Sequence, residues 1–488
     1  MQIWDVIVAG AGTAGIPAAI FAARRGARVL LLEHASEVGG TLHVSGGQLS
    51  AAGNRIQADK GIEDSTQEHF DDVMRITKGT ADAKMVRLAV NNAPDTLDWL
   101  LANGFEPLPD HPVIHFGHEP YSIPRTYWGM HNGLSILSVL QTQLAAELDN
   151  GGIFLRLQTE LSGLQLNETG TVTGVIARNQ DGTTESFSGR NTVLTSGGYA
   201  ANKELFPVYT NGYPLFGGAY PFSQGSGVRL ALEAGAELCH SDTFVPFFAG
   251  VEDIEGSGLM TIITHTTPQW REPWEIYVNR AGKRFVSEDT KSVDEREMRL
   301  IEQPDLTFWV IYDAAIAEEA PTIFGRPRHR EDQTGGLATA AIEKAFSGHP
   351  SFIRAESLRA LAGEAGIDAA GLETTVAEYN AAVKSGSDPL GRKHMPRPIS
   401  VPPFHAIKHH GMSVSGPAGL AIDEGLRVLK ADGTPIPNLY AAGEILGTGL
   451  FHGKAIVGGM NATPALTFGR LLGQSILQWQ GAEAALEV

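Results

Sequence analysis

Three glycines near the start of the chain have the spacing of a phosphate-binding turn. Gly10, Gly12 and Gly15 form the pattern G-x-G-x-x-G between an apolar run at 3–9 and a helix-like segment at 13–25. The first glycine of such a turn allows a tight bend, the second lets the backbone approach a pyrophosphate, and the third lets the helix pack on the strand. The N-terminus of the helix favours the phosphate charge. The pattern therefore predicts a dinucleotide site.

An acidic residue ends the next apolar run, at 27–32, where it can serve the same ligand. Glu33 can accept a hydrogen bond from a ribose hydroxyl, and a carboxylate at this place disfavours the 2′-phosphate of NADP. Further glycine-rich segments lie at 37–47, 193–198 and 439–444. Clustered glycine indicates backbone held close to a ligand. Contacts at so many places along one ligand favour FAD over NAD.

The expected elements place these turns at the ends of strands. Residues 3–32 predict a strand, a helix and a second strand, which is the start of a parallel sheet. Alternating apolar and polar residues at 153–195 predict a small antiparallel meander. Residues 105–133 form a long loop rich in proline, histidine and aromatic residues, and the Pro-rich stretch at 396–403 predicts a linker back to the first domain.

Composition and charge exclude several classes of protein. The chain has 488 residues, with 37 Lys and Arg against 55 Asp and Glu and a net charge of −18. Such an acidic surface repels nucleic acid and anionic lipid. Cys239 is the only cysteine, which excludes an internal disulfide and an iron–sulfur site, and no metal site is predicted. Because the start lacks a secretory signal and no apolar stretch reaches about 20 residues, we expect a cytoplasmic protein without a membrane span.

Later segments of the chain carry a resemblance to a known family. They are EVGGTLHVSGG (37–47), YVNRAGKRFVSED (277–289), HHGMSVS (409–415), and NLYAAGE and GGMNATPALTFGRLLG within 438–473. With the N-terminal glycine turn, they resemble the flavoprotein family that includes succinate dehydrogenase, fumarate reductase, urocanate reductase and 3-ketosteroid dehydrogenase. The resemblance covers nearly the whole chain and is nearer to the 3-ketosteroid dehydrogenase branch.

The resemblance implies a fold class and a cofactor. The fold is α/β: a Rossmann-like FAD-binding domain, with a parallel sheet and the small antiparallel meander, carries an inserted α+β capping domain. The FAD-binding domain would comprise 1–244 and 401–488, and the cap 245–400. FAD is expected to be non-covalent, because the spacing at His43 differs by one residue from that of covalent attachment. The expected cofactor-binding residues are Gly10, Gly12, Thr13, Ala14, Gly15, Glu33, His34, Gly39, Gly40, Thr41, Ser45, Gly46, Gly47, Ser196, Gly197, Gly198, Gly443, Glu444, Gly459 and Asn461.

Departures from the family pattern bear on the reaction. Ser292 stands where fumarate reductases carry a proton-donating arginine and the ketosteroid enzymes a tyrosine. A serine is a poor proton donor unless another group activates it. The segment HGKAIVGG (452–459) lacks the arginine that clamps a carboxylate in the dicarboxylate reductases, which leaves Lys454 as a looser point charge. Gly459 stands where the ketosteroid enzymes offer a backbone N–H to a ketone oxygen.

The expected substrate and catalytic residues come from this resemblance and from the loop at 105–133. His409 matches a substrate-binding histidine of the fumarate reductases, and the loop offers phenols as bases and a guanidinium as an anion partner. Each of these side chains could instead serve only in packing. The candidate catalytic residues are His409, His410, Tyr121, Tyr127 and Ser292, and the candidate substrate-binding residues are Gly459, Arg125, His452 and Lys454.

The predicted function is an FAD-dependent oxidoreduction of a CH–CH bond. In the favoured interpretation, the enzyme desaturates the bond alpha,beta to the carbonyl of a cyclic ketone: a base removes the alpha proton and flavin N5 accepts the beta hydride. One alternative is the reduction of an activated alkene acid, fumarate- or urocanate-like, with Arg125, Arg271 and Lys454 as candidate anion clamps. Another is a non-catalytic flavin-binding subunit of a complex. The expected partners are a small-molecule substrate and an external electron acceptor, namely oxygen, a quinone or a carrier, with no nucleic acid.

Overall fold

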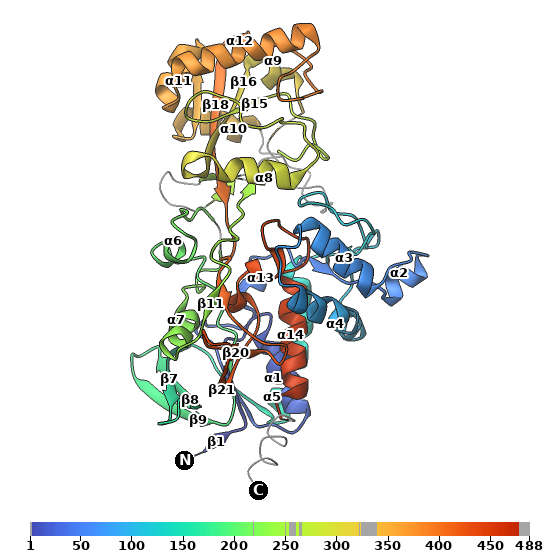
Figure 1. Ribbon diagram of the computed structural model, residues 1–488, viewed down its shortest axis with the longest axis vertical. Helices are drawn as coiled ribbons and strands as arrows, with labels where there is room; N and C mark the ends of the chain where they lie inside the picture. The colour runs from blue at the N-terminus through green and yellow to red at the C-terminus, as the bar shows by residue number, and fades with distance from the viewer. Residues whose placement is uncertain are drawn as a thin grey trace.

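The described residues form two bodies, one above the other in Figure 1. The computed structural model describes residues 2–217, 219–248, 250–252, 260–262, 266–321, 323 and 339–477. The lower body contains the N-terminus and the last described helix, and the upper body is built from the middle of the chain. No helix within the described ranges is both long enough and apolar enough to cross a membrane.

A six-stranded sheet forms the centre of the lower body. Its order is β20-β21-β10-β2-β3-β6, and every pair is parallel except β20 with β21. The strands are β2 (Val6–Ala9), β3 (Val29–Leu32), β6 (Ile153–Arg156), β10 (Thr192–Leu194), β20 (Arg427–Leu429) and β21 (Pro435–Ala441). Strands β2 and β3 are wholly buried, as expected of parallel strands covered on both faces. The predicted parallel sheet is confirmed.

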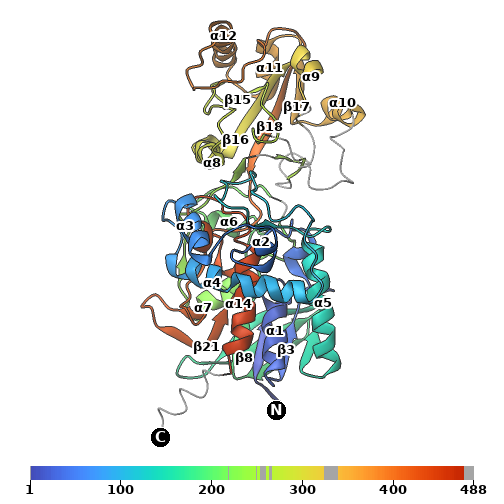
Figure 2. The same cartoon turned by 90° about the vertical axis from the view of Figure 1, so that its right-hand side faces the viewer.

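Helices cover one face of this sheet and a meander covers the other (Figures 1 and 2). The helices are α1 (Gly15–Arg24), α5 (Gly133–Asp149) and α14 (Ala462–Ser475), with α4 (Ala83–Ala102) packed on α14. The meander is β7 (Thr159–Leu166), β8 (Val172–Asn179) and β9 (Thr184–Gly189), with β1 (Ile3–Trp4) along β9. Helix α14 lies so close to α1 that a Cβ at Gly469 would come within 2.1 Å of the Ala14 carbonyl oxygen. The C-terminal segment is thus held against the N-terminal glycine turn.

Shorter elements surround the lower body. The helices are α2 (Arg55–Asp59), α3 (Thr66–Ile76), α6 (Leu205–Tyr209), α7 (Ser226–Glu233) and α13 (Gly449–His452), with the 3-10 turns η1 (Gly40–His43) and η3 (Glu444–Leu446). The short strands are β4 (Leu49–Ser50), β5 (Thr126–Tyr127), β11 (Leu238–Cys239) and β19 (Gly419–Leu420). Strands β4 and β5 pair and join the loop at 105–133 to the segment after η1.

The upper body is an α+β cap built on an antiparallel sheet. The sheet has the order β12-β18-β16-β15, with β17 beside β18. Its strands are β12 (Phe247–Phe248), β15 (Ile276–Val278), β16 (Thr307–Asp313), β17 (Phe352–Ala355) and β18 (Phe404–Met412), and β13 (Val251–Glu252) and β14 (Met260–Ile262) form a separate pair. The helices are α8 (Val293–Ile301), α9 (Ala314–Glu319), α10 (Thr339–Gly348), α11 (Leu358–Ala365) and α12 (Ala369–Ser385), with the turn η2 (Pro304–Leu306). The predicted α+β cap is confirmed.

The chain passes through the cap sheet once more, as β18, after the Pro-rich stretch at 396–403 and before it returns to the lower body. Strand β18 pairs with β16 along its whole length, for example His409 with Phe308. Residues 404–412 therefore pair with the cap sheet, and the domain boundary at 400 stays a prediction. Nonlocal hydrogen bonding, and not the proline content of 396–403, decides which sheet a strand enters.

Candidate functional site

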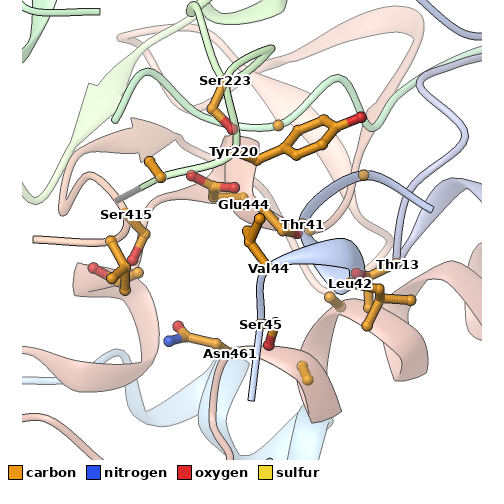
Figure 3. Close-up of a pocket in the computed structure, with 18 of the residues that line it drawn as sticks. Thr13, Thr41, Leu42, Val44, Ser45, Tyr220, Ser223, Ser415, Glu444 and Asn461 are labelled. Carbon is orange, nitrogen blue, oxygen red and sulfur yellow. The ribbon is translucent and has the colours of Figure 1, made fainter. Parts of the chain in front are cut away.

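A cavity of about 770 Å³ lies between the lower body and the cap. Its floor is formed where parallel strands end: Gly10 follows β2, Glu33 follows β3, Ser196 follows β10 and Gly443 follows β21. Ligands of open parallel sheets bind at such carboxyl ends. Figure 3 shows polar side chains, among them those of Glu444 and Ser223, around this space. The cavity is therefore the candidate dinucleotide site.

Most of the predicted cofactor-binding residues line this cavity. They are Gly10, Gly12, Thr13, Ala14, Glu33, His34, Gly40, Thr41, Ser45, Gly46, Ser196, Gly197, Gly443, Glu444, Gly459 and Asn461. The other four, Gly15, Gly39, Gly47 and Gly198, lie behind the lining, where a Cβ would collide with neighbouring atoms. At Gly15, for example, a Cβ would come within 1.8 Å of the Gly10 carbonyl oxygen. These four act through close backbone packing.

Several buried polar atoms of cavity-lining side chains have no hydrogen-bond partner among the described residues. Among those near the glycine turns are Gln48 Nε2, Ser196 Oγ and Glu444 Oε1. Buried polar groups are normally hydrogen-bonded, so these atoms fit a polar ligand such as FAD. Burial raises the pKa of the Glu444 carboxyl to about 7, and near neutrality this group can therefore donate a hydrogen bond as well as accept one.

Glu33 joins two loops at the floor of the cavity. Its Oε2 accepts from the Ala11 backbone N–H at 2.8 Å, and its Oε1 accepts from the Ala35 N–H at 2.8 Å. Each carboxylate oxygen has a further lone pair. The side chain can therefore hold the glycine turn in place and still accept from a ribose hydroxyl, the role predicted from the sequence.

Replacing Gly12 by valine tests whether the cofactor occupies the glycine turn. The nearest protein atom to a Cβ at Gly12 is Gly40 Cα, at 3.8 Å, so the protein itself has room for the side chain. We expect an unchanged melting temperature of the apoprotein and an FAD dissociation constant about 10- to 100-fold higher, since the side chain overlaps the pyrophosphate. In contrast, Gly10→Val should fail to fold, because a Cβ there lies 2.3 Å from the Thr195 carbonyl oxygen. Fluorescence titration measures the affinity, and unchanged FAD binding by Gly12→Val would place the pyrophosphate elsewhere.

The two loop tyrosines do not reach the cavity. The Tyr121 hydroxyl donates to the Gly458 carbonyl oxygen at 2.6 Å, and the Tyr127 hydroxyl accepts from Asn54 Nδ2 at 2.7 Å. Burial raises the pKa of both phenols well above the ordinary value. Both phenols are engaged in packing the loop onto the lower body and do not line the cavity, so the catalytic base stays a prediction that this arrangement does not support.

Arg125 is a buried structural cation. Its guanidinium makes two bonds to Asp64, at 2.8 and 3.0 Å, and one to Asp72 at 2.6 Å. The side chain is completely buried, as is that of Asp64. Two carboxylates already neutralise this cation, so the structure offers no support for Arg125 as a partner of a substrate anion, and that role stays a prediction. Arg271, the other arginine proposed as a clamp, is likewise paired with Glu275, at 2.9 Å.

The predicted histidines lie in the cap sheet, outside the cavity lining. His409 Nδ1 is 3.0 Å from the Ile407 carbonyl oxygen, and its ring stacks on Phe308 with centroids 5.0 Å apart. Burial lowers the pKa of His409 to about 4. His410 Nδ1 lies 2.8 Å from Thr307 Oγ1, and its ring stacks on Phe216. Because consecutive residues of β18 point to opposite faces of the sheet, His409 packs on Phe308 in the cap and His410 packs on Phe216. Their catalytic role stays a prediction.

The other candidates also have structural roles. Ser292 is the N-cap of α8, where its hydroxyl accepts from the Glu295 N–H at 3.1 Å. Lys454 is half-exposed and lies 3.6 Å from Asp242. His452 lies behind the lining: its Nδ1 accepts from the Val457 N–H at 2.9 Å, so its Nε2–H donates to Asn461 Oδ1 at 2.8 Å. Because this bond occupies Asn461 Oδ1, the amide nitrogen of Asn461 remains available to donate a hydrogen bond to a ligand in the cavity.

Arg296 is the functional candidate that the sequence analysis missed. It lies on α8 one turn after Ser292 and lines the cavity. The side chain is buried; Nη1 donates to the Thr266 carbonyl oxygen, and the guanidinium carbon is 5.5 Å from the Phe248 ring. A signal was present in the sequence, because Arg296 occupies the buried stripe of α8 with Val293 and Leu300, where an apolar residue is expected.

Arg296 has no direct carboxylate partner within the described chain, although Glu297 and Glu119 lie near enough to favour its charge. None of its described contacts is an ion pair with a carboxylate, and Nε has no hydrogen-bond partner there. The neighbouring Glu297 also lines the cavity, and burial raises the pKa of its carboxyl well above the ordinary value. Because burial favours the protonated form of Glu297, this carboxyl offsets the guanidinium charge less than an ionised carboxylate would. Since a buried unpaired charge is costly, this site is suited to an anionic ligand.

Contacts from the lower body hold α8 over the cavity. Glu119, in the loop at 105–133, accepts from the Val293 N–H at 3.1 Å and the Asp294 N–H at 3.3 Å. Lys78 Nζ lies 2.5 Å from Asp294 Oδ2. A carboxylate at a helix N-terminus is stabilised by the free N–H groups. These contacts fix the position of α8, and with it Arg296, at the same cavity that the glycine turns line.

A glycine turn at the end of a parallel sheet, facing a cap that carries a buried cation, defines a two-domain dinucleotide-dependent oxidoreductase. The model of the FAD binding domain family matches residues 5–462, so the chain belongs to this family. The fumarate reductase (cytochrome) of Shewanella frigidimarina is 29% identical over 97% of this chain and 77% of its own length.

Solved structures agree with this assignment. The open conformation of a flavocytochrome c3 fumarate reductase has a TM-score of 0.72 at 26% identity, covering 98% of this chain and 78% of that one. The 3-ketosteroid delta1-dehydrogenase of Sterolibacterium denitrificans shares the fold, with a TM-score of 0.76 at 21% identity, covering 98% and 100%. The flavoprotein family, FAD as cofactor and an oxidoreductase acting on CH–CH bonds are confirmed.

Proposed function

We propose that the protein reduces the activated carbon–carbon double bond of a small unsaturated acid. The observation that carries this proposal is Arg296, the only lysine or arginine among the described residues that line the cavity. It is buried and lacks a carboxylate partner within the described chain. A planar guanidinium in such a site binds a carboxylate strongly.

The residues of the chain supply positioning and a proton. Bound FAD supplies hydride exchange at N5. Arg296 holds the substrate carboxylate and draws electron density from the double bond. Burial raises the pKa of the Glu297 carboxyl well above its ordinary value and so favours the protonated form, and a protonated carboxyl is a competent general acid. In the balanced reaction, the beta carbon receives the hydride, the alpha carbon receives the proton, and an external donor restores the two electrons.

Anaerobic stopped-flow measurement tests this function. The holoenzyme is reduced photochemically and mixed with unsaturated acids or with cyclic enones, and the return of the flavin absorbance is followed. Reoxidation by the acids, with the saturated acid as product, is the expected result. Reoxidation by neither class of compound would contradict the proposal and would favour the interpretation as a non-catalytic flavin subunit.

A second candidate is the desaturation of a cyclic ketone. Gly459 lines the cavity, and its backbone supports this candidate because an N–H there could donate a hydrogen bond to the carbonyl oxygen of the substrate. The predicted bases Tyr121, Tyr127, His409 and His410 do not line the cavity, so this chemistry lacks its expected base. Bleaching of the oxidised flavin by a cyclic ketone would favour it, with oxygen, a quinone or a carrier as acceptor.

Attachment and location stay predictions. His43 Nε2 lies 3.0 Å from the Val38 carbonyl oxygen, and His43 is not part of the cavity lining. Both observations support non-covalent FAD. The cytoplasmic location predicted from the sequence is not tested by the fold.

A further inference from the structure

Three hydrogen-bond donors meet the cavity at the segment 457–461, just before α14. Gly459 and Asn461 line the cavity, and the Gly459 N–H takes part in none of the described hydrogen bonds. Gln48 Nε2 is buried without a partner in the described chain, and a Cβ at Gly458 would come within 2.9 Å of it. Figure 3 shows the Asn461 side chain at the edge of the same space. Such donors are suited to a ligand group that carries negative charge.

Tyr121 fixes the direction of the Gly459 N–H from behind the cavity lining. Its hydroxyl donates to the Gly458 carbonyl oxygen at 2.6 Å, and His69 Nε2 lies 3.4 Å from the same hydroxyl. The Gly458 carbonyl and the Gly459 N–H belong to one planar trans peptide, so they point in opposite directions. Because Tyr121 lies outside the lining, the bond that holds the carbonyl turns the N–H toward the cavity.

His452 fixes the amide of Asn461, also from behind the lining. A neutral imidazole has one donor nitrogen and one acceptor nitrogen. The Val457 N–H occupies Nδ1 at 2.9 Å, so Nε2 carries the proton that Asn461 Oδ1 accepts at 2.8 Å. Burial lowers the pKa of His452 to about 4, so the imidazole is neutral near pH 7 and keeps this arrangement. The oxygen of the amide is thereby held away from the ligand and its nitrogen is left to donate.

We propose that Tyr121 and His452 are positioning residues that raise the reduction potential of FAD. Neither lines the cavity, and each acts through the donor that it orients. Reduction adds negative charge to the pyrimidine part of an isoalloxazine ring, so fixed donors bind the reduced form more tightly than the oxidised form. The glycine turn and Glu33 serve the pyrophosphate and the ribose, which leaves the segment 457–461 for the ring. The inference does not depend on which substrate the enzyme uses.

Two tyrosine variants test the role of Tyr121 on the holoenzyme without substrate. Tyr121→Phe should weaken binding of reduced FAD relative to oxidised FAD about 10-fold, which lowers the two-electron midpoint potential by about 30 mV. Tyr127→Phe is the matched control, because it removes a buried hydroxyl of the same loop that bonds Asn54 instead, and it should leave the potential unchanged. Titration against a redox dye measures the potential. Equal potentials in the two variants would mean that Tyr121 only packs the loop, and would overturn its role.

Variants of His452 and Asn461 test whether His452 acts through the amide. His452→Leu removes the donor, whereas His452→Gln keeps an amide nitrogen near the place of Nε2. We expect the midpoint potential to fall by about 30 mV in His452→Leu, for a 10-fold change in relative affinity, and to stay near the wild-type value in His452→Gln. Asn461→Ala, which truncates an exposed side chain, should lower the potential alone, and His452→Leu should add nothing to it. An unchanged potential in Asn461→Ala, a further fall in the double variant, or an equal fall in both His452 variants would overturn the role of His452.

Discussion

Arg296→Met lowers kcat/KM for unsaturated acids about 100- to 1000-fold, while the protein keeps its FAD. The expected effect corresponds to about 3–4 kcal/mol, the usual cost of removing one partner of a buried charge pair. Methionine keeps much of the apolar length of the side chain against the Phe248 ring. Steady-state kinetics with a reduced artificial electron donor measures the loss, and the flavin absorbance per protein measures cofactor content.

A matched control distinguishes the effect of removing the guanidinium at the cavity from the effect of removing a positive charge elsewhere on α8. Arg299 also lies on α8, but it is half-exposed and pairs with Glu302 at 3.3 Å. Arg299→Met should change kcat/KM less than threefold, because an exposed ion pair contributes only about 0.2–1 kcal/mol. If Arg296→Met and Arg299→Met have equal effects, Arg296 does not bind the substrate.

Arg125→Met lowers the free energy of unfolding by about 3–5 kcal/mol. The substitution leaves the carboxylates of Asp64 and Asp72 buried without the cation that both contact. The expected result is a large fall in the urea midpoint with an unchanged slope. Equilibrium unfolding of the apoprotein, followed by tryptophan fluorescence, measures it.

The comparison with Arg75 makes this prediction specific. Arg75 contacts the same Asp72 at 2.6 Å but is half-exposed, so Arg75→Met should cost at most about 1 kcal/mol. Replacing Asp64 by asparagine in the Arg125→Met background should restore part of the stability, because it removes one uncompensated charge. If Arg125→Met were stable but failed to bind substrate, the side chain would be the anion clamp that the sequence suggested.

The dinucleotide site could be predicted from the sequence because its determinants are local. Gly10, Gly12 and Gly15 act through backbone conformation and the absence of a Cβ, and Glu33 acts at a fixed distance after a strand. Such properties belong to short segments and do not depend on distant partners. The same holds for the glycine turns at 193–198 and 439–444, which follow β10 and β21; in the sheet, β10 lies between β2 and β21. Residue types and spacing therefore determined the fold class and the cofactor.

The substrate end of the cavity was decided by tertiary contacts alone. Tyr121, Arg125 and His409 are of chemically suitable types, but distant parts of the chain engage them. The Gly458 carbonyl binds Tyr121, two carboxylates bind Arg125, and Phe308 stacks on His409. The sequence analysis overlooked Arg296 because the feature that makes it a candidate is the lack of a direct carboxylate partner at the cavity, and a sequence does not show which residues are paired. The physical reason is that a charged or phenolic side chain is available for chemistry only when the fold leaves it buried, directed at a cavity and unpaired.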